Sequence, residues 1–249
     1  MREGDGWMGL FLRRAAPLYA MWIARRHLDG VFVRGLESTR ALLDQRPVIL
    51  ASTHSSWWDG QLLLVLFRAL GVPAAFLVDA SSVEEMSYLR KMGAIPIDAG
   101  SLTSSVAAME EAAAVLSAPR RAVWIFPQGV LRPPDVRPLG LQRGVDLLAR
   151  HSRAVVVPVA MVPGWRLLHL PSWAISFGAP LEPGRDLMER LETALVAEIE
   201  ELERFFDERH QDVSLEVLVP SVVVPFERRF GARVYLFFAE LWGRLWRRR

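Results

Sequence analysis

Apolar runs of strand length alternate with helical segments through most of residues 31–209. A buried strand is a short continuous apolar run, whereas a helix repeats its apolar residues three or four positions apart. Strands are expected at residues 31–34, 47–52, 74–78, 94–98, 122–126, 154–160 and 174–177, and helices at residues 37–44, 61–70, 83–92, 102–116, 140–151 and 187–206. This alternation predicts the α/β class, with a mixed, largely parallel sheet flanked by helices.

The two ends of the chain share a composition that is typical of membrane interfaces. Residues 7–27 predict an apolar helix with four aromatic side chains and flanking arginine pairs, and Pro17 is expected to kink or interrupt it. Residues 233–246 predict a second helix with one apolar face, and three arginines follow it. Interfacial helices place aromatic rings at headgroup level and arginines on phosphates. The alternative for the first helix is packing against the core.

No uninterrupted apolar run reaches the roughly 18–20 residues of a spanning helix, and no signal peptide is apparent. We therefore expect a peripheral membrane protein on the cytoplasmic face of the cell membrane. Three parts are predicted: an interfacial helix over residues 1–30, a central α/β domain over residues 31–225, and a basic amphipathic helix over residues 226–249.

Composition excludes several kinds of chemistry. The 249 residues contain no Cys, so disulfides, thiolate metal ligands and a cysteine nucleophile are ruled out. The formal net charge is only +2, which gives no bulk argument for binding nucleic acid. Histidines and carboxylates do not recur at the spacing of metal ligands, so no metal site is expected.

The best candidate for catalysis lies where the strand predicted at residues 47–52 gives way to a helix. His54 and Asp59 stand there with four residues between them. An imidazole titrates near neutral pH, and a nearby carboxylate can fix its tautomer and stabilise its cation. The pair therefore suggests a general base, His54, oriented by Asp59. The alternatives are a structural histidine and a helix N-cap, and the second is compatible with the catalytic role.

Three further segments can reach the same edge of a parallel sheet. Phe126, Pro127, Gln128 and Gly129 follow another predicted strand, although these residues by themselves also suit a simple turn. Arg143 and Gly144 lie near the start of a predicted helix, where backbone N–H groups and a cation are available. A proline-containing strand follows at residues 154–160.

Taken in order, these motifs resemble the 1-acyl-glycerol-3-phosphate acyltransferase family of membrane-associated glycerolipid acyltransferases. The family's Asn-His-x4-Asp motif appears as Thr-His-Ser-Ser-Trp-Trp-Asp at residues 53–59. Its Phe-Pro-Glu-Gly-Thr-Arg-Ser motif corresponds to Phe-Pro-Gln-Gly-Val-Leu-Arg at residues 126–132. Its Phe-Lys-x-Gly and Val-x-Pro-Val elements correspond to residues 141–144 and 156–159. The resemblance covers roughly residues 31–180.

This resemblance implies transfer of a fatty acyl group from acyl-CoA or acyl carrier protein to a hydroxyl of a membrane lipid acceptor, with residues 31–225 as the catalytic domain. His54 would take the hydroxyl proton and Asp59 would hold the imidazole, while backbone donors of the following helix would stabilise the oxyanion. Residues 126–129, Arg132, Arg143 and Gly144 would bind substrate. No cofactor is implied beyond the acyl thioester itself.

The departures from the family pattern concern the residues associated with an acceptor phosphate. The family's glutamate is Gln128 here, its following arginine is Leu131, and the arginine expected after the Gly-x-Ile-x-Ile-Asp motif is Ala99. One hypothesis is an altered acceptor, such as a glycolipid. The other is that arginines 132, 137 and 143 rebuild the phosphate site. Two other functions remain open: a non-catalytic lipid-binding protein that kept the fold, and a hydrolase that uses the same pair with water.

Overall fold

Strands of the computed structural model form one sheet, within a described chain that comprises residues 7–165, 170–207 and 215–220. They are β1 (Gly30–Arg34), β2 (Val48–Ser52), β3 (Phe76–Asp79), β4 (Ala94–Ile97), β5 (Ala122–Ile125), β6 (Val155–Gly164), β7 (Ser172–Phe177) and β8 (Glu216–Pro220). Their order across the sheet is β4-β3-β5-β2-β6-β7-β1-β8.

The sheet is largely parallel. Strands β4, β3, β5, β2 and β6 run parallel to one another, and β7 runs parallel to β1. The pairs β6–β7 and β1–β8 are antiparallel. The predicted fold class is therefore confirmed. Strand β8 was not among the expected strands, and it adds an antiparallel edge beside β1.

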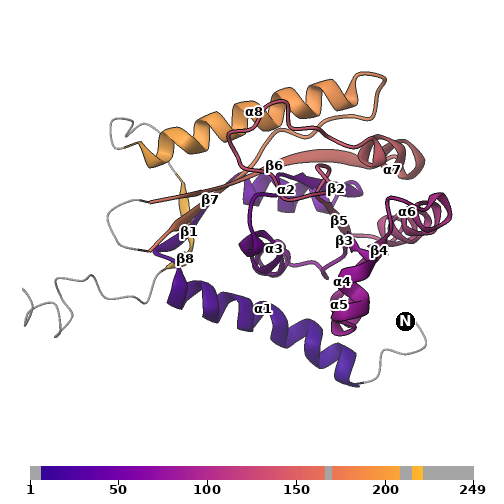
Figure 1. The fold of residues 1–249 in the computed structure, drawn as a ribbon, viewed down its shortest axis with the longest axis horizontal. Coiled ribbons are helices and arrows are strands. Elements are labelled where there is room, and N and C mark those ends of the chain that lie inside the picture. Colours follow the sequence, from indigo (N-terminus) through magenta and orange to yellow (C-terminus); the bar gives the residue numbers. More distant parts are fainter. Residues whose placement is uncertain (1–6, 166–169, 208–214, 221–249) are drawn as a thin grey trace, which may run out of the picture.

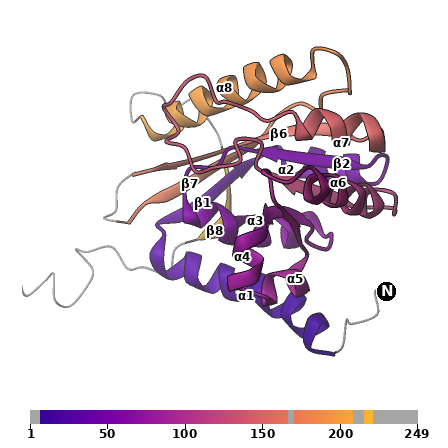
Figure 2. The same ribbon diagram turned by 45° about the vertical axis from the view of Figure 1, so that its right-hand side comes forward.

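Helices cover both faces of the sheet (Figures 1 and 2). They are α1 (Trp7–His27), α2 (Leu36–Leu43), α3 (Trp57–Leu70), α4 (Ala80–Glu85), α5 (Tyr88–Met92), α6 (Leu102–Leu116), α7 (Gly144–Ser152) and α8 (Leu187–Phe206). Helices α1 to α5 pack on one face, and α6, α7 and α8 pack on the other.

The central strands supply side chains to both cores, because successive residues of a strand point to opposite faces. Val48 and Leu50 of β2 lie in the core beneath α3, and Ile49 and Ala51 lie in the core beneath α6 to α8. All five residues of β2 are buried, as expected for a parallel strand with helices on both sides. The carboxyl end of β2 is therefore fixed in the middle of the molecule, at the edge where the candidate site lies.

Several predicted boundaries were wrong. The helix expected over residues 61–70 begins earlier, at Trp57, because residues 56–59 form a capping box. The helix expected over residues 83–92 is two short helices, since the backbone leaves the helical region at Met86 (φ −126°, ψ 68°). The helix expected over residues 140–151 begins at Gly144, after Gln142 N donates to Pro127 O.

Helix α1 continues through Pro17 without interruption, so the predicted break does not occur. Its inner side is part of the core, where Ala20 and Ala24 are buried against α3 and the sheet. Near its start, Arg13 Nε donates to Lys91 O of α5 at 2.9 Å. None of the helices in the described ranges is both long enough and apolar enough to cross a bilayer. The amphipathic helix predicted over residues 226–249 lies outside the described residues.

A glycine closes α5 and allows β4 to start beside β3. Gly93 has a φ of +110°, in the left-handed region, and a Cβ at this position would lie 2.0 Å from Ala74 O. Only a residue without a side chain fits so close to the neighbouring backbone. This close approach places Phe76 N within 3.1 Å of Gly93 O and sets the register between the two strands.

Helix α8 is tied to the sheet by an ion cluster as well as by its buried leucine stripe. Arg34 of β1 donates to Glu198 at 2.6 Å, to Glu201 at 2.9 Å and to the Ser176 hydroxyl at 2.7 Å. Burial by itself lowers the pKa of Arg34, but the hydrogen bonds and charges of the two glutamates outweigh it and raise the pKa above its ordinary value. The cluster joins β1 and β7 to α8 and stabilises the packing of this helix on the sheet.

Candidate active site

The connection from β2 to α3 carries the predicted base. Helix α3 begins at Trp57 because Ser56 caps it and Asp59, in the first turn, completes a capping box. Such a box satisfies backbone N–H groups that a helix start would otherwise leave without partners. The Ser-x-x-Asp sequence at residues 56–59 is the signal that marks this helix start. It places Asp59 in the first turn of α3, five positions after His54.

The structure brings the imidazole and the carboxylate together. His54 Nδ1 lies 3.0 Å from Asp59 Oδ2, and Asp59 is completely buried whereas 24% of the His54 side chain is exposed. Asp59 Oδ2 also accepts from Ser55 N at 2.7 Å and from Ser56 N at 2.8 Å. Because an ionised carboxylate oxygen can only accept, we assign the Nδ1 proton to the bond with Asp59 Oδ2, which leaves His54 Nε2 as the basic nitrogen.

These bonds use three of the N–H groups at the start of α3, where donors for an oxyanion were expected. The N–H groups of Ser55 and Ser56 donate to Asp59, and Trp58 N donates to the Ser56 hydroxyl at 3.2 Å. The N–H groups of these residues therefore serve the capping box. They hold the carboxylate in place and are not free to bind a reacting carbonyl oxygen.

The loop after β5 supports the imidazole from the other side. The rings of Phe126 and His54 stack with centroids 4.1 Å apart and planes 22° apart. Gln128 is buried, and its Oε1 accepts from His54 N at 2.7 Å. Arg132 N donates to His54 O at 2.8 Å. Since β2 and β5 are parallel neighbours, the two loops leave the same edge of the sheet and pack together.

Strand β6 holds the residue before the base. Thr53 N donates to Val159 O at 3.1 Å, and Met161 N donates to the Thr53 hydroxyl at 2.9 Å. The segment that resembles the family's Val-x-Pro-Val element thus lies directly beside the base-carrying loop. Its contribution to the site is structural, through the backbone of Thr53.

Gly129 turns the β5 loop toward α7. It has a φ of +70°, and a hydrogen bond from its N–H to Phe126 O, 3.0 Å long, closes the turn. Gln142 N then donates to Pro127 O at 2.7 Å, which places Arg143 and Gly144 at the start of α7 beside the loop.

A large, mainly apolar cavity of about 1740 Å³ opens in front of His54. Residues 126–129, Arg143 and Gly144 line it, and Asp59 does not, because it lies behind the imidazole. The apolar lining comes chiefly from helices on both sides of the sheet edge and from the α4–α5 connection: Leu12, Leu63, Leu64, Met86, Leu89, Met92, Leu102, Val106 and Met109. The predicted base therefore faces a space suited to an aliphatic chain.

The three arginines that were candidates for a phosphate site are separated. Arg143 lines the cavity. The Arg132 guanidinium packs against Gly140: a Cβ added to this glycine would lie 3.1 Å from the guanidinium atoms. Arg132 is not part of the cavity lining. Arg137 donates to Val136 O at 3.1 Å and is likewise absent from the lining. Within the described ranges, no three His, Asp or Glu side chains gather closely enough to hold a metal ion.

The comparison with known families rests on the same part of the chain. A family model described as Acyltransferase matches residues 30–162, which is more than half of the 249 residues. The chain belongs to the acyltransferase family. No curated protein matches it closely enough to count as similar. The matched span of this acyltransferase begins with β1 and ends within β6, so it includes His54, Asp59, the β5 loop and the start of α7.

Proposed function

We propose that this acyltransferase moves a fatty acyl group from acyl-CoA or acyl carrier protein to a hydroxyl of a lysophospholipid or related lipid acceptor at a membrane surface. The observation that carries the proposal is the His54–Asp59 pair, with the carboxylate behind the imidazole and an apolar cavity in front of it. The function belongs to lipid metabolism, and phospholipid biosynthesis is the leading candidate.

In the proposed reaction His54 Nε2 removes the proton of the acceptor hydroxyl while its oxygen attacks the thioester carbonyl. Asp59 stabilises the imidazolium that forms. When the tetrahedral intermediate collapses, the carbon–sulfur bond breaks and the thiolate takes the proton from the imidazolium, which releases a thiol and an ester. General base catalysis of this kind contributes on the order of 10²–10⁴ in rate.

The cavity supports a lipid substrate. Ordinary small-molecule sites have volumes of about 300–1,000 Å³, and this cavity is larger and bordered mostly by aliphatic and aromatic side chains. Long acyl chains gain binding free energy by leaving water for such a surface, at roughly 0.8 kcal/mol per buried methylene.

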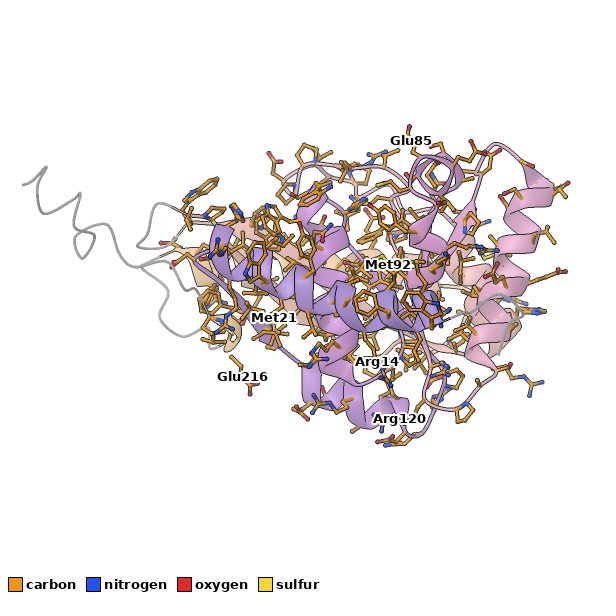
Figure 3. The ribbon with its side chains drawn as sticks, turned by 90° about the horizontal axis from the view of Figure 1, so that it is seen from below. Arg14, Met21, Glu85, Met92, Arg120 and Glu216 are labelled. Carbon is orange, nitrogen blue, oxygen red and sulfur yellow. The ribbon has the colours of Figure 1, made fainter. Side chains whose placement is uncertain are left out.

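Helix α1 supports docking to a membrane. Its outer side exposes Trp7, Phe11, Tyr19 and Trp22, and arginine pairs stand at residues 13–14 and 25–26. The Arg26 guanidinium lies 4.7 Å from the Trp22 ring centre. Figure 3 shows the face of the molecule on which α1 lies, with Arg14 and Met21 marking the helix and Met92 marking the neighbouring α5. Leu12, Ala15, Ala16 and Tyr19 also line the cavity, so the docking helix borders the substrate space.

The positions of the arginines favour a second candidate, an acceptor without a phosphate, such as a glycolipid. Arg143 and Arg150 are the arginines in the lining of the described cavity, and Asp146 neutralises Arg150 with two bonds of 2.8 Å. This leaves Arg143 as the candidate for an acceptor phosphate, where the family pattern has two cations at other positions.

The test uses purified full-length protein on liposomes, with labelled acyl-CoA or acyl carrier protein and a panel of acceptors. Lysophosphatidic acid and a neutral glycolipid are compared at equal surface density. We expect His54→Ala to lower transfer by at least about 100-fold. His27 is an exposed histidine at the end of α1, so the control variant His27→Ala should keep wild-type activity.

Each outcome separates the alternatives. Efficient acylation of lysophosphatidic acid would rule out the altered acceptor. Thiol release without an acylated lipid would favour a hydrolase. If the wild type releases no thiol with any acceptor, the protein is a lipid-binding member of the family. In every case liposome flotation of His54→Ala should match that of the wild type.

A further inference from the structure

Gln128 is a buried polar side chain whose partner is the base itself. Only 3% of the residue is exposed, and its amide oxygen accepts the backbone N–H of His54 at 2.7 Å. The contact joins residues 74 positions apart, from the loops after two neighbouring strands. A buried side-chain amide that accepts a hydrogen bond from a catalytic loop fixes the position of that loop.

Two side chains divide the backbone donors around the base. Asp59 accepts from Ser55 N and Ser56 N, and Gln128 accepts from His54 N. The imidazole is thus held at its ring by the carboxylate and at its own backbone by the amide. Loss of the amide would leave the His54 N–H without its acceptor and would free the residue to rotate relative to the cavity.

Asp59 carries a carboxylate and Gln128 a neutral amide, and this difference affects the electrostatic surroundings of the proposed base. Around His54 the carboxylate of Asp59 is the charged group in hydrogen-bond contact with the ring. The other titratable or charged groups that line the cavity are Asp79, Glu110, Arg143, Arg150 and His151, together with Tyr19 and Tyr88. Phe126, stacked on the ring, is uncharged. A carboxylate at position 128 would add a second negative charge in hydrogen-bond contact with the backbone of His54.

We propose that Gln128 is a positioning residue that holds the His54 backbone and, being neutral, lets the imidazole stay unprotonated at a lower pH than a carboxylate in its place would. This inference rests on the proposed function of His54 as the base. It assigns to Gln128 a role in the working pH range of the enzyme, in addition to its place in the substrate cavity.

The decisive variant is Gln128→Glu, which keeps the shape and the acceptor oxygen but adds charge. A nearby carboxylate favours the imidazolium, and a base must be unprotonated to work. The acid limb of the pH–kcat profile should therefore move to higher pH by about one unit. At alkaline pH the variant should return to within about threefold of wild-type kcat, since the hydrogen bond to His54 N is kept.

The matched control is Gln128→Leu, which is similar in size and cannot accept a hydrogen bond. Its kcat should fall about 10- to 100-fold at every pH because the base is misplaced. The acid limb and the KM for the acyl donor should not change. A structural role alone would lower activity in both variants without moving the acid limb in either.

A readout without substrate separates this inference from the proposed reaction. Histidine-labelled protein gives an NMR titration for His54, assigned by the loss of its signal in His54→Ala. Gln128→Glu should raise the midpoint of this titration, and Gln128→Leu should leave it within about 0.3 pH unit, because both side chains are neutral. This holds even if every acyl acceptor tested proves inactive.

Two results would overturn the inference. One is a Gln128→Glu variant with an unchanged midpoint and an unchanged acid limb, which would remove the electrostatic role. The other is a folded Gln128→Leu variant with wild-type kcat, which would remove the positioning role. Circular dichroism and thermal melting establish that each variant is folded before either result is counted.

Discussion

One oxygen of Asp59 organises the first turn of α3. Oδ2 faces the His54 ring and two backbone N–H groups, whereas Oδ1 is buried and has no hydrogen-bond partner among the residues that the structure describes. An anion suits this arrangement because a single oxygen with several lone pairs can accept all three donors. The same residue therefore caps a helix and holds the imidazole of the proposed base.

We predict that Asp59→Asn lowers acyl transfer by at least about 100-fold and the free energy of unfolding by about 1–3 kcal/mol. The amide loses the charge that stabilises the imidazolium. If its oxygen replaces Oδ2, its NH2 group points to the buried side where Oδ1 has no partner. Thiol release and urea denaturation measure the two effects.

The control for this variant is Asp44→Asn. Asp44 lies 3.2 Å from Arg120 in an exposed ion pair, and such pairs contribute little. Activity should be unchanged and stability should change by less than about 0.5 kcal/mol. An active Asp59→Asn enzyme would contradict the orienting role of the carboxylate.

Residue spacing was sufficient to predict that His54 and Asp59 form a pair, because both lie in one local junction. It was not sufficient for the bond between Gln128 and the His54 backbone, since that contact depends on which strands become neighbours. The same limit applies to the arginines. The sequence places arginines 132, 137 and 143 close together along the chain, but the Arg132 guanidinium packs against Gly140 whereas Arg143 lines the cavity.

Among the secondary-structure elements, two glycines near the site occupy opposite environments. Gly93 ends α5 at positive φ, and its Cβ position collides with Ala74 O. Gly60 lies inside α3, and beyond the backbone of its own helix and its chain neighbours no atom of the described residues is within 4 Å of its Cβ position. Glycine is required at position 93 by the backbone conformation and the close contact, whereas Gly60 only lowers the helix propensity of α3.

We predict that Gly93→Ala lowers the free energy of unfolding by at least about 2 kcal/mol, while Gly60→Ala raises it by about 0.5–1 kcal/mol. The first substitution must displace the β3–β4 junction, whereas the second improves helix propensity without a clash. Urea denaturation of the two variants beside the wild type measures both. Equal effects in the same direction would contradict the environments described for these glycines.

Elements with a strong pattern were predicted well, and their ends were not. The stripe that includes Leu187, Leu191 and Leu195 gave the position of α8 because it repeats over five turns. The short α4 and α5 were merged, since neither carries a pattern long enough to show the interruption at Met86. Strand β8 was missed: its apolar run covers only residues 217–219, and most of the strand is exposed because it lies at the edge of the sheet.

At the scale of the whole molecule, α1 connects the core to the proposed membrane surface. We predict that replacing Trp7, Phe11 and Trp22 by Ser lowers the fraction of protein that floats with liposomes by at least about tenfold. These rings are exposed in the structure, so the fold should be unaffected. Liposomes with and without anionic lipid show whether the flanking arginines contribute.

The substitution Val136→Ser is the control because this side chain is exposed, lies outside α1 and does not line the cavity. It should float like the wild type. Wild-type flotation of the triple variant would refute the role of α1. Deleting residues 1–28 is a poorer test, since it removes Ala20, Ala24 and Leu28 from the core and would expose the apolar surface beneath them.

The capping box at the start of α3 has a consequence for how the site assembles. The carboxylate that closes the first turn of the helix is the one that holds the imidazole, so the start of α3 and the alignment of the proposed catalytic pair depend on one side chain. Local fraying of this single turn would therefore separate the imidazole from its carboxylate while the sheet beneath it remains intact.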